Sequence, residues 1–162
     1  MDLKQFLELF NPKPGNKFLQ VTTKLDETTL ALEKLIQTVE GEMHVALYCG
    51  RDNNLEEYSQ LIIQNIDNFK KPFRAIPRDY DIVIFKDILD LHHNPKGILK
   101  IAYATLANNA NIIIMQKKDT LDIEATKLLL EEMEFRNPNE IDIMSHFDVI
   151  VARKLHMWGN GL

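Results

Sequence analysis

Three stretches of the chain are apolar almost without interruption, which is the pattern of strands buried on both faces of a parallel sheet. They are HVALYC (residues 44–49), IVIF (82–85) and NIIIMQ (111–116). A shorter stretch, KFLQVT (17–22), has the same character. All four are predicted to be strands, and YDIVIFKD, which contains IVIF, gives the strongest signal.

Five other segments place apolar residues three or four positions apart, which is the spacing of an amphipathic helix. The first is stopped by NPKPGN, because two prolines and a glycine do not continue a helix. Another is predicted to begin at Asn54, and the next at Asn94 with Pro95 in the first helical position. In chain order the predicted helices cover residues 2–10, 25–40, 54–69, 95–106 and 122–135.

Weaker strand signals lie near the middle and at the end of the chain. PFRAIP (72–77) is predicted to be a short strand at best. EIDIM and FDVIVARKL are separated only by Ser145 and His146, which favours an antiparallel hairpin. Strands alternate with helices before that point, which is typical of a parallel sheet covered on both faces. The predicted fold class is therefore α/β, with a mainly parallel sheet, the first strand near its centre and a C-terminal antiparallel hairpin.

The composition fits one folded domain. The chain has 162 residues, of which 45% are hydrophobic and 27% charged. We assign residues 1–16 to a leading helix and connector, 17–155 to the α/β domain and 156–162 to a tail. The net charge of -5, without a block of Lys and Arg, makes nucleic acid an unexpected partner.

Membrane and redox signals are also sparse. No apolar run approaches the roughly 20 residues that span a bilayer, so no membrane association is expected. MDLKQFLELF at the start lacks the basic-then-apolar pattern of a signal peptide. The single cysteine, Cys49, excludes an internal disulfide and fits a reducing, cytoplasmic location.

The segment YDIVIFKDILDLHHNPKGILKIAYATLANNANIIIM resembles the second half of a class I S-adenosylmethionine-dependent methyltransferase. In that family a strand opens with Phe/Tyr-Asp and ends near an acidic or polar residue. A loop and an Asp-Pro-like helix start follow, as in Asn94-Pro95. HVALYCGRDNNLEEYSQL and FDVIVARK are similar to two further segments of the family. The resemblance covers about residues 17–155 and implies a single-domain Rossmann-like methyltransferase fold.

One turn departs from the family pattern. Asn108-Asn109-Ala110 stand where the family has Pro-Gly-Gly before its next strand. Asparagine tolerates left-handed backbone angles better than other non-glycine residues. We therefore expect the turn to be retained without glycine.

The resemblance also implies a cofactor site beyond the carboxyl ends of the strands. A glycine-rich loop after the first strand should approach the cofactor, but QVTTK contains no glycine, and the side chains of Gln20 and Thr22 would crowd that space. The ribose-binding acid is expected where Cys49 stands, and Asp52 is its only nearby replacement. Cofactor-binding candidates are therefore Gln20, Thr22, Cys49 and Asp52, in a motif that looks degenerate.

Each of these residues also has a structural interpretation. Thr22, Thr23 or Asp26 would cap the following helix through side-chain oxygens. Cys49 would be a small core residue. Asp52 would cap the next helix in competition with its asparagine neighbours.

The loop after YDIVIFKD is the best-preserved part of the resemblance. Asp87 ends a buried strand at the expected crevice, and His92 and His93 follow in the loop. Histidine at such a position suits general-base catalysis near neutral pH, so these three are the catalytic candidates. The alternative is that Asp87 caps the loop and the histidines are exposed spacers. The spacing of histidine and cysteine predicts no metal site.

Two functions remain open from the sequence. The first is a methyltransferase-like protein with weakened or lost S-adenosylmethionine binding, acting as a binding or scaffold module. The second is an active class I methyltransferase on an unknown substrate. A flavodoxin-like or receiver-like domain is disfavoured, since QVTTK lacks the paired acids of a receiver. The apolar leading helix and the tail HMWGNGL form a candidate surface for a homodimer or a protein partner.

Overall fold

A seven-stranded mixed sheet forms the centre of the protein in the computed structural model, which describes residues 3–50 and 60–155. Its strands are β1 Lys17–Thr22, β2 Glu42–Tyr48, β3 Leu61–Ile66, β4 Tyr80–Lys86, β5 Leu106–Lys117, β6 Arg136–Glu140 and β7 Phe147–Arg153. The helices are α1 Leu3–Leu7, α2 Glu27–Gln37, α3 Pro95–Thr105 and α4 Ile123–Glu132.

The strand order is β3-β2-β1-β4-β5-β7-β6. Strands β1 to β5 pair in parallel, and β7 runs antiparallel to both β5 and β6. The predicted fold class, the position of the first strand near the centre and the terminal hairpin are all confirmed. Parallel pairing of β1 with β2 and β4 places their carboxyl ends at one edge of the sheet, where the functional site is expected.

Two element predictions near the middle of the chain were wrong. Residues 61–66, predicted to continue a helix, form strand β3, whose register runs from Met43↔Leu61 to Tyr48↔Ile66. Residues 72–77, predicted as a short strand, form no regular element. LIIQNI is a short apolar run that satisfies both helical and strand spacing, and only its pairing with β2 decides between them. The predicted start of that helix at Asn54 lies outside the described residues.

The hairpin is shifted from its predicted position. Its first strand is β6, Arg136–Glu140, and the segment EIDIMS mostly forms the connection to β7. β6 is an edge strand and contains Pro138, which lacks a backbone N–H. Proline is tolerated in a sheet at such an edge because no neighbouring strand needs its donor.

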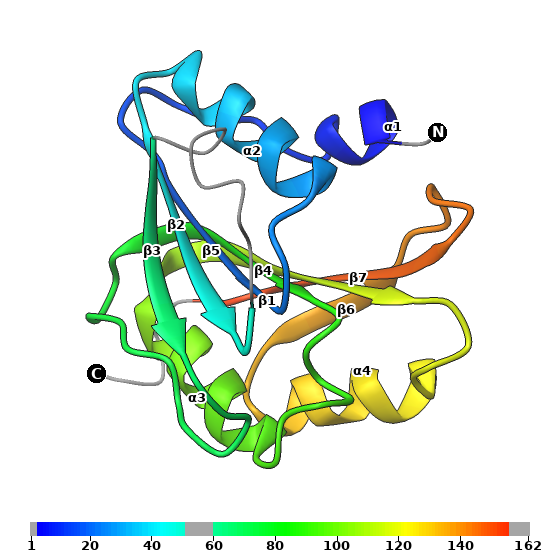
Figure 1. Cartoon of the computed structure of the whole chain (residues 1–162). Helices are drawn as coiled ribbons and strands as arrows, with labels where there is room; N and C mark the ends of the chain where they lie inside the picture. The colour runs from blue at the N-terminus through cyan, green and yellow to red at the C-terminus, as the bar shows by residue number, and fades with distance from the viewer. Residues whose placement is uncertain (1–2, 51–59, 156–162) are drawn as a thin grey trace, which may run out of the picture.

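The sheet lies between two helical layers, with α1 and α2 on one face and α3 and α4 on the other (Figure 1). Each face has its own apolar cluster, since successive side chains of a strand point to opposite sides. Phe18 of β1 packs in the cluster with Leu32 and Ile36 of α2, whereas Leu19 packs in the cluster with Ile98 of α3. The uninterrupted apolar runs of the central strands follow from this double coverage.

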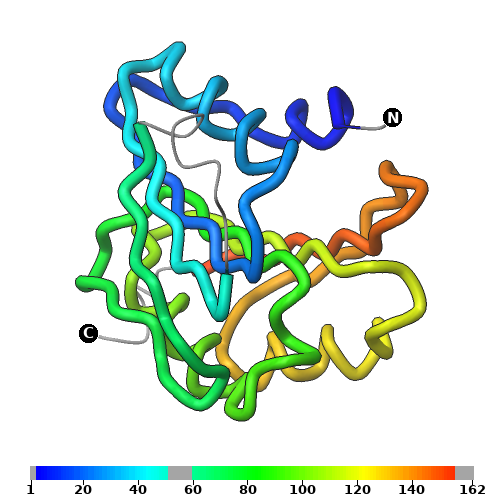
Figure 2. The backbone as a smooth tube through the Cα atoms, in the orientation of Figure 1, coloured from blue at the N-terminus to red at the C-terminus, as the bar shows by residue number. Residues whose placement is uncertain are grey.

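The connection between β3 and β4 belongs to the α3 face. Phe69, Phe73 and Ala75 of this connection pack in the same cluster as Ile98 and Leu99 of α3. Figure 2 shows the backbone of this segment returning from the end of β3 to the start of β4. It supplies apolar cover for the α3 face of the sheet without a helix or a strand.

Local signals fix the helix starts as predicted for α2 and α3. Asp26 caps α2 by accepting from the backbone N–H groups of Thr28 and Thr29, so the cap is Asp26 and not a threonine. Asn94 caps α3, with Pro95 at the first position. Asn109 adopts the left-handed conformation at φ 68°, which asparagine tolerates. The separate turn expected at Asn108-Asn109-Ala110 is not formed, because these residues lie within β5, where its register with β4 is irregular.

The leading helix is shorter than predicted, and its apolar side faces its own domain. Phe6 and Phe10 are buried, and the ring centroid of Phe10 lies 5.4 Å from that of Phe18 of β1, with the rings tilted by 47°. Leu3 and Leu7 are half-buried in the same cluster.

The tail, residues 156–162, lies outside the described residues. Among the helices described, none has the length and apolar character needed to cross a bilayer.

Candidate functional site

A cleft of about 770 Å³ opens at the carboxyl edge of the sheet, where β1, β4 and β5 end. The β1–α2 loop and the first turn of α2 form one wall, and the ends of β4 and β5 form the other. The start of β7 also contributes. The lining residues are Thr23, Lys24, Asp26, Glu27, Lys86, Asp87, Asp90, Leu91, Gln116, Lys117, Thr120 and Phe147.

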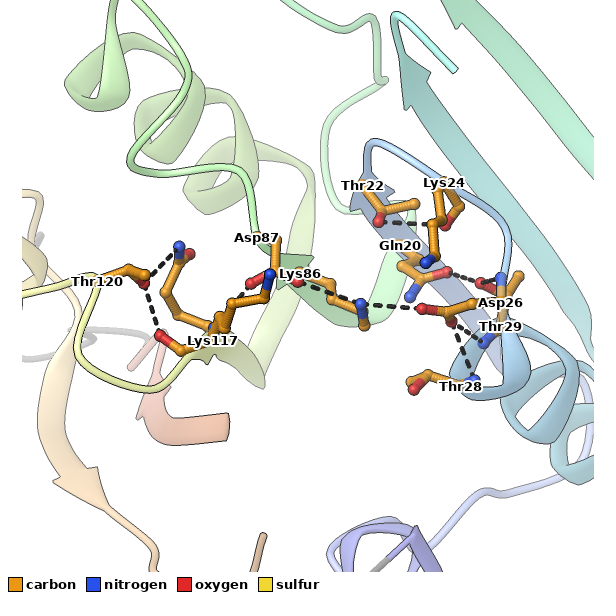
Figure 3. A network of polar contacts seen from close by, with 11 residues as sticks. Gln20, Thr22, Lys24, Asp26, Thr28, Thr29, Lys86, Asp87, Lys117 and Thr120 are labelled. Atoms are coloured by element: carbon orange, nitrogen blue, oxygen red, sulfur yellow. Dashed lines mark hydrogen bonds and ion pairs between the residues drawn. The ribbon is translucent and has the colours of Figure 1, made fainter. Parts of the chain in front are cut away.

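Lys86 joins the two walls. Its ammonium lies 2.9 Å from Asp26 Oδ2 and 3.2 Å from Asp87 Oδ2, and only 7% of its side chain is exposed. Figure 3 shows Lys86 reaching from the end of β4 to Asp26 at the start of α2. Burial by itself lowers the pKa of Lys86, but the hydrogen bonds and charges of Asp26 and Asp87 outweigh it, so the pKa is raised. The lysine is therefore held charged between two carboxylates.

Asp87, which follows β4, pairs with Lys86 and also forms hydrogen bonds to the backbone of β5. Its Oδ1 accepts from the backbone N–H of Lys117 at 2.7 Å, and its own N–H donates to the carbonyl of Met115 at 3.0 Å. The residue adopts a left-handed φ of 54°, which aspartate tolerates better than most side chains. Of the three predicted catalytic residues, Asp87 is the one that lines the cleft.

Gln20 and Thr22 lie beneath α2 and do not line the cleft. Gln20 is fully buried, and its Oε1 accepts from the Thr29 hydroxyl at 2.7 Å (Figure 3). Thr22 is 1% exposed and its hydroxyl donates to the carbonyl of Lys24 at 3.4 Å. Alternation along β1 turns both side chains to the α2 face. The β1–α2 loop instead presents Thr23, Lys24 and Asp26 to the cleft.

Cys49 borders a second cavity, of about 610 Å³, at the carboxyl ends of β2 and β3. Its side chain is exposed, its φ is 52° and its thiol lies 3.4 Å from the carbonyl of Asp67. Lys71 and Arg74 also line this cavity. Asp52, the candidate replacement for a ribose-binding acid, lies outside the described residues.

His92 is buried with both ring nitrogens engaged. Nδ1 accepts from the backbone N–H of Asn94 at 2.9 Å, so the proton sits on Nε2, which donates to the carbonyl of Lys71 at 2.9 Å. The Tyr48 hydroxyl donates to that same carbonyl at 2.7 Å. His93 is exposed, and neither histidine lines the cleft. These contacts join the start of α3 to the β3–β4 connection.

Of the residues that line the cleft, only Asp87 was a site candidate from sequence, and three of the others are central to its polar contacts. Lys86 closes an apolar strand with a charge directly before Asp87, a signal that could have been noticed. Asp26 was considered only as a helix cap, and Gln116 was read only as the end of a buried strand. Their shared position depends on the adjacency of β1, β4 and β5, which no local pattern specifies.

Comparisons with known proteins bear on the fold. No protein-family profile and no curated protein matches the sequence. Solved structures of methyltransferases are similar to this chain in fold. A SAM-dependent methyltransferase from Aquifex aeolicus superposes with a TM-score of 0.71 at 14% identity, covering 95% of this chain and 90% of that one.

Two larger methyltransferases give similar superpositions. The CurJ carbon methyltransferase has a TM-score of 0.73 at 15% identity and covers 96% of this chain. Phosphoethanolamine N-methyltransferase 2 from Haemonchus contortus, solved with phosphomonomethylethanolamine and S-adenosylhomocysteine, has a TM-score of 0.72 at 10% identity. This chain spans about half the length of each, 54% and 53% respectively.

At these identities the likeness shows the fold alone. The seven-stranded sheet, its order and its antiparallel β7 make this the Rossmann-like fold of class I methyltransferases, as the resemblance implied. Other structures with this fold hold S-adenosylmethionine or S-adenosylhomocysteine.

Proposed function

We propose that this chain is a methyltransferase-like binding module in which S-adenosylmethionine binding is weakened or lost. The observation that carries the proposal is the ion cluster of Asp26, Lys86 and Asp87. It crosses the junction of β1 and β4, where the resemblance places the cofactor loop and the reacting groups. Side chains that pair with one another line the part of the cleft in which the resemblance expects backbone to approach a cofactor.

The cluster is costly to open. Removing one partner of a buried ion pair typically costs 3–5 kcal/mol, because the remaining charge loses its compensation. A cofactor that needs this space must either separate Lys86 from its carboxylates or bind beside it. Either alternative makes the binding free energy of the cofactor less favourable.

The remaining cofactor positions support the same proposal. Thr23 and Lys24 occupy the turn in which the resemblance expects glycine, and each adds a side chain that lines the cleft. Cys49 occupies the position at which the resemblance expects the ribose-binding acid, and it borders the second cavity. A thiol is a weak hydrogen-bonding substitute for a carboxylate. The interactions that hold the two ends of the cofactor are therefore replaced at both cavities.

An active methyltransferase is the second candidate. Its supporting observation is that two cavities open along the carboxyl edge, one at β2 and β3 and one at β1, β4 and β5. This is the edge at which open α/β sheets bind ligands. Backbone contacts alone would then have to hold the cofactor.

Calorimetric titration of the full chain with S-adenosylmethionine and with S-adenosylhomocysteine tests the proposal. We expect no saturable heat at micromolar concentrations for either compound. A cofactor-binding methyltransferase of the same fold, titrated in parallel, serves as the positive control. A dissociation constant tighter than about 10 μM, worth roughly 7 kcal/mol, would instead support the active enzyme.

A further inference from the structure

The cavity of about 610 Å³ at the carboxyl ends of β2 and β3 carries an excess of positive charge. Among the described residues that line it, Asp67, Lys71 and Arg74 are the charged ones, and all three are exposed. They belong to the connection between β3 and β4, which returns past the end of β3 (Figure 2). The charge at this cavity therefore comes from the connection and not from the strands.

The backbone of Lys71 is fixed by buried partners. Its carbonyl accepts from the Tyr48 hydroxyl at 2.7 Å and from Nε2 of His92 at 2.9 Å. Tyr48 is fully buried in β2, and only 6% of His92 is exposed. The Lys71 side chain, in contrast, is 59% exposed, and its ammonium lies 2.9 Å from Asp67 Oδ1. Lys71 is thus held at the cavity by its main chain, while its charged end stays accessible.

Gln64 of β3 fixes the backbone of Arg74 in a similar way. Its Oε1 accepts from the Arg74 backbone N–H at 2.6 Å, and its Nε2 donates to the Arg74 carbonyl at 3.0 Å. Phe73, the preceding residue, is 1% exposed, and its ring centroid lies 6.1 Å from that of Phe85. The main chain at Arg74 is therefore anchored to both the edge strand and the core.

The two cations differ in how far they are already neutralised. Lys71 pairs with Asp67, and its hydrogen bond and charge lower the pKa of that carboxyl, so Asp67 stays ionised. Arg74 forms no ion pair with any other described residue. Guanidinium is weakly hydrated and offers paired N–H donors that match phosphate oxygens. An exposed, unpaired arginine beside a cavity thus favours an anionic ligand.

The position of these cations matters for the kind of anion. The resemblance expects an acid at the end of β2 that accepts from ribose hydroxyls, but Cys49 stands there, and its thiol donates to the carbonyl of Asp67 at 3.4 Å. In dinucleotide-binding sheets an acid at this place selects a free ribose hydroxyl, whereas a nearby arginine accommodates a ribose phosphate. Replacing the acid by a neutral thiol with cations beside it reverses the charge preference of the cavity.

We propose that this cavity binds the phosphate group of a phosphomonoester through Lys71 and Arg74. Arg74 donates to the phosphate oxygens, and Lys71 supplies a second positive charge that it shares with Asp67. The inference rests on the proposed function, because it gives the binding module a ligand class that S-adenosylmethionine, which has no phosphate, does not belong to. Free phosphate and a phosphorylated ribose share this chemistry, and the probes below separate them.

Adenosine 2′-monophosphate, adenosine and inorganic phosphate are the three probes. Each is titrated at low salt into the isotopically labelled full chain and followed by NMR. We expect the nucleotide to bind most tightly, phosphate about tenfold more weakly and adenosine most weakly. The backbone amide signals of Gly50, Lys71 and Arg74 should move with both phosphate compounds, and added salt should weaken both. Equal affinities for phosphate and the nucleotide would support the site with the free ion as its ligand.

Two variants and a matched control locate the contact. Arg74→Gln is expected to weaken nucleotide binding by about tenfold, because it removes the unpaired cation. Asp67→Asn should tighten binding by about threefold, since it releases Lys71 from its ion pair. Arg136→Gln makes the same change as Arg74→Gln at an exposed position on β6, the opposite edge of the sheet, and should leave binding unchanged. All three side chains are exposed, so the variants are expected to fold.

Several results would overturn the phosphate site. They are adenosine binding as tightly as its 2′-monophosphate, Arg74→Gln binding like Arg136→Gln, and Asp67→Asn binding no more tightly than the wild type. The cofactor titration reports separately on the proposed function. If neither the phosphate probes nor the cofactor bind, this inference fails and the loss of cofactor binding stands. Saturable binding of S-adenosylmethionine would overturn the proposed function, whatever the phosphate probes do.

Discussion

Lys86 Nζ lies 2.9 Å from Asp26 Oδ2, and this ion pair joins the end of β4 to the N-cap of α2. The lysine side chain is 7% exposed and the aspartate 17%. The same lysine contacts Asp87 at 3.2 Å. A residue that caps a helix and a residue that ends a strand are thus held together at the mouth of the cleft.

Replacing Lys86 with alanine is expected to destabilise the protein by roughly 2–4 kcal/mol. The change leaves Asp26 and Asp87 facing each other without a cation, although their partial exposure moderates the cost. Lys96→Ala is the matched control, because its pair with Glu132 is exposed at 61% and 56% and is worth at most about 1 kcal/mol. Urea unfolding measures both variants, and equal stabilities would contradict the role assigned to Lys86.

Stability is expected to fall in alkaline solution. Burial raises the pKa of Tyr48 and of Tyr80 to about 12 from 10.0, and the pKa of Lys86 is also raised. Because each folded-state pKa lies above its unfolded value, the stabilisation is complete below about pH 10 and is lost as the pH rises toward 12. Each tyrosine should account for roughly 2–3 kcal/mol of the loss.

Denaturant unfolding at a series of pH values, with tyrosinate absorbance as a second signal, measures this dependence. Tyr80→Phe should flatten the alkaline fall by the share of one tyrosine. It also removes the hydrogen bond between the Tyr80 hydroxyl and Nδ1 of His44, at 3.0 Å, so its stability near neutral pH should be lower by about 1 kcal/mol. A wild-type stability that is flat from pH 9 to 12 would contradict the prediction.

His92→Leu is expected to cost roughly 2–4 kcal/mol in unfolding free energy. It leaves the N–H of Asn94 without its acceptor and removes one donor from the carbonyl of Lys71. His93→Leu, one residue further along the same loop, changes an exposed side chain and should alter stability by less than about 0.5 kcal/mol. If the two variants unfold alike, the buried contacts of His92 do not contribute as described.

The leading helix is predicted to stabilise its own domain. Phe6→Ala should cost about 3–5 kcal/mol, because Phe6 is fully buried and contacts Phe10 at 5.3 Å between ring centroids. Lys4→Ala on the exposed side of the same helix is the control, with an expected change below about 0.5 kcal/mol. Thermal unfolding of both variants measures the difference.

A partner surface at the chain ends remains a separate prediction. With Phe6 and Phe10 buried, the leading helix offers only half-buried Leu3 and Leu7 to a partner, together with the tail that begins at residue 156. Sedimentation of the intact chain should reveal association that a version ending at Leu155 lacks. Two equally folded and equally monomeric proteins at high concentration would rule this surface out.

Much of the fold could be predicted because local signals agree with it. The apolar runs of β2, β4 and β5 require burial on both faces, and that requirement selects a parallel sheet covered by helices. Asn94 and Pro95 mark the start of α3 through backbone chemistry that does not depend on the rest of the chain. The left-handed backbone at Asn109 is likewise allowed by its residue type, although it lies within β5 and not in a separate turn.

Tertiary structure decided the remainder. LIIQNI carries apolar residues at both spacings, and only hydrogen bonding to β2 makes it strand β3. Asp87 could be located because it ends a strong strand, whereas the contacts of Lys86 with Asp26 and the position of Gln116 require β1, β4 and β5 to lie side by side. Gln20 and Thr22 were expected near a ligand, but the alternation of β1 and the packing of α2 turn them into the core. Strand adjacency is set by long-range packing, so the site could not be read from neighbouring residues alone.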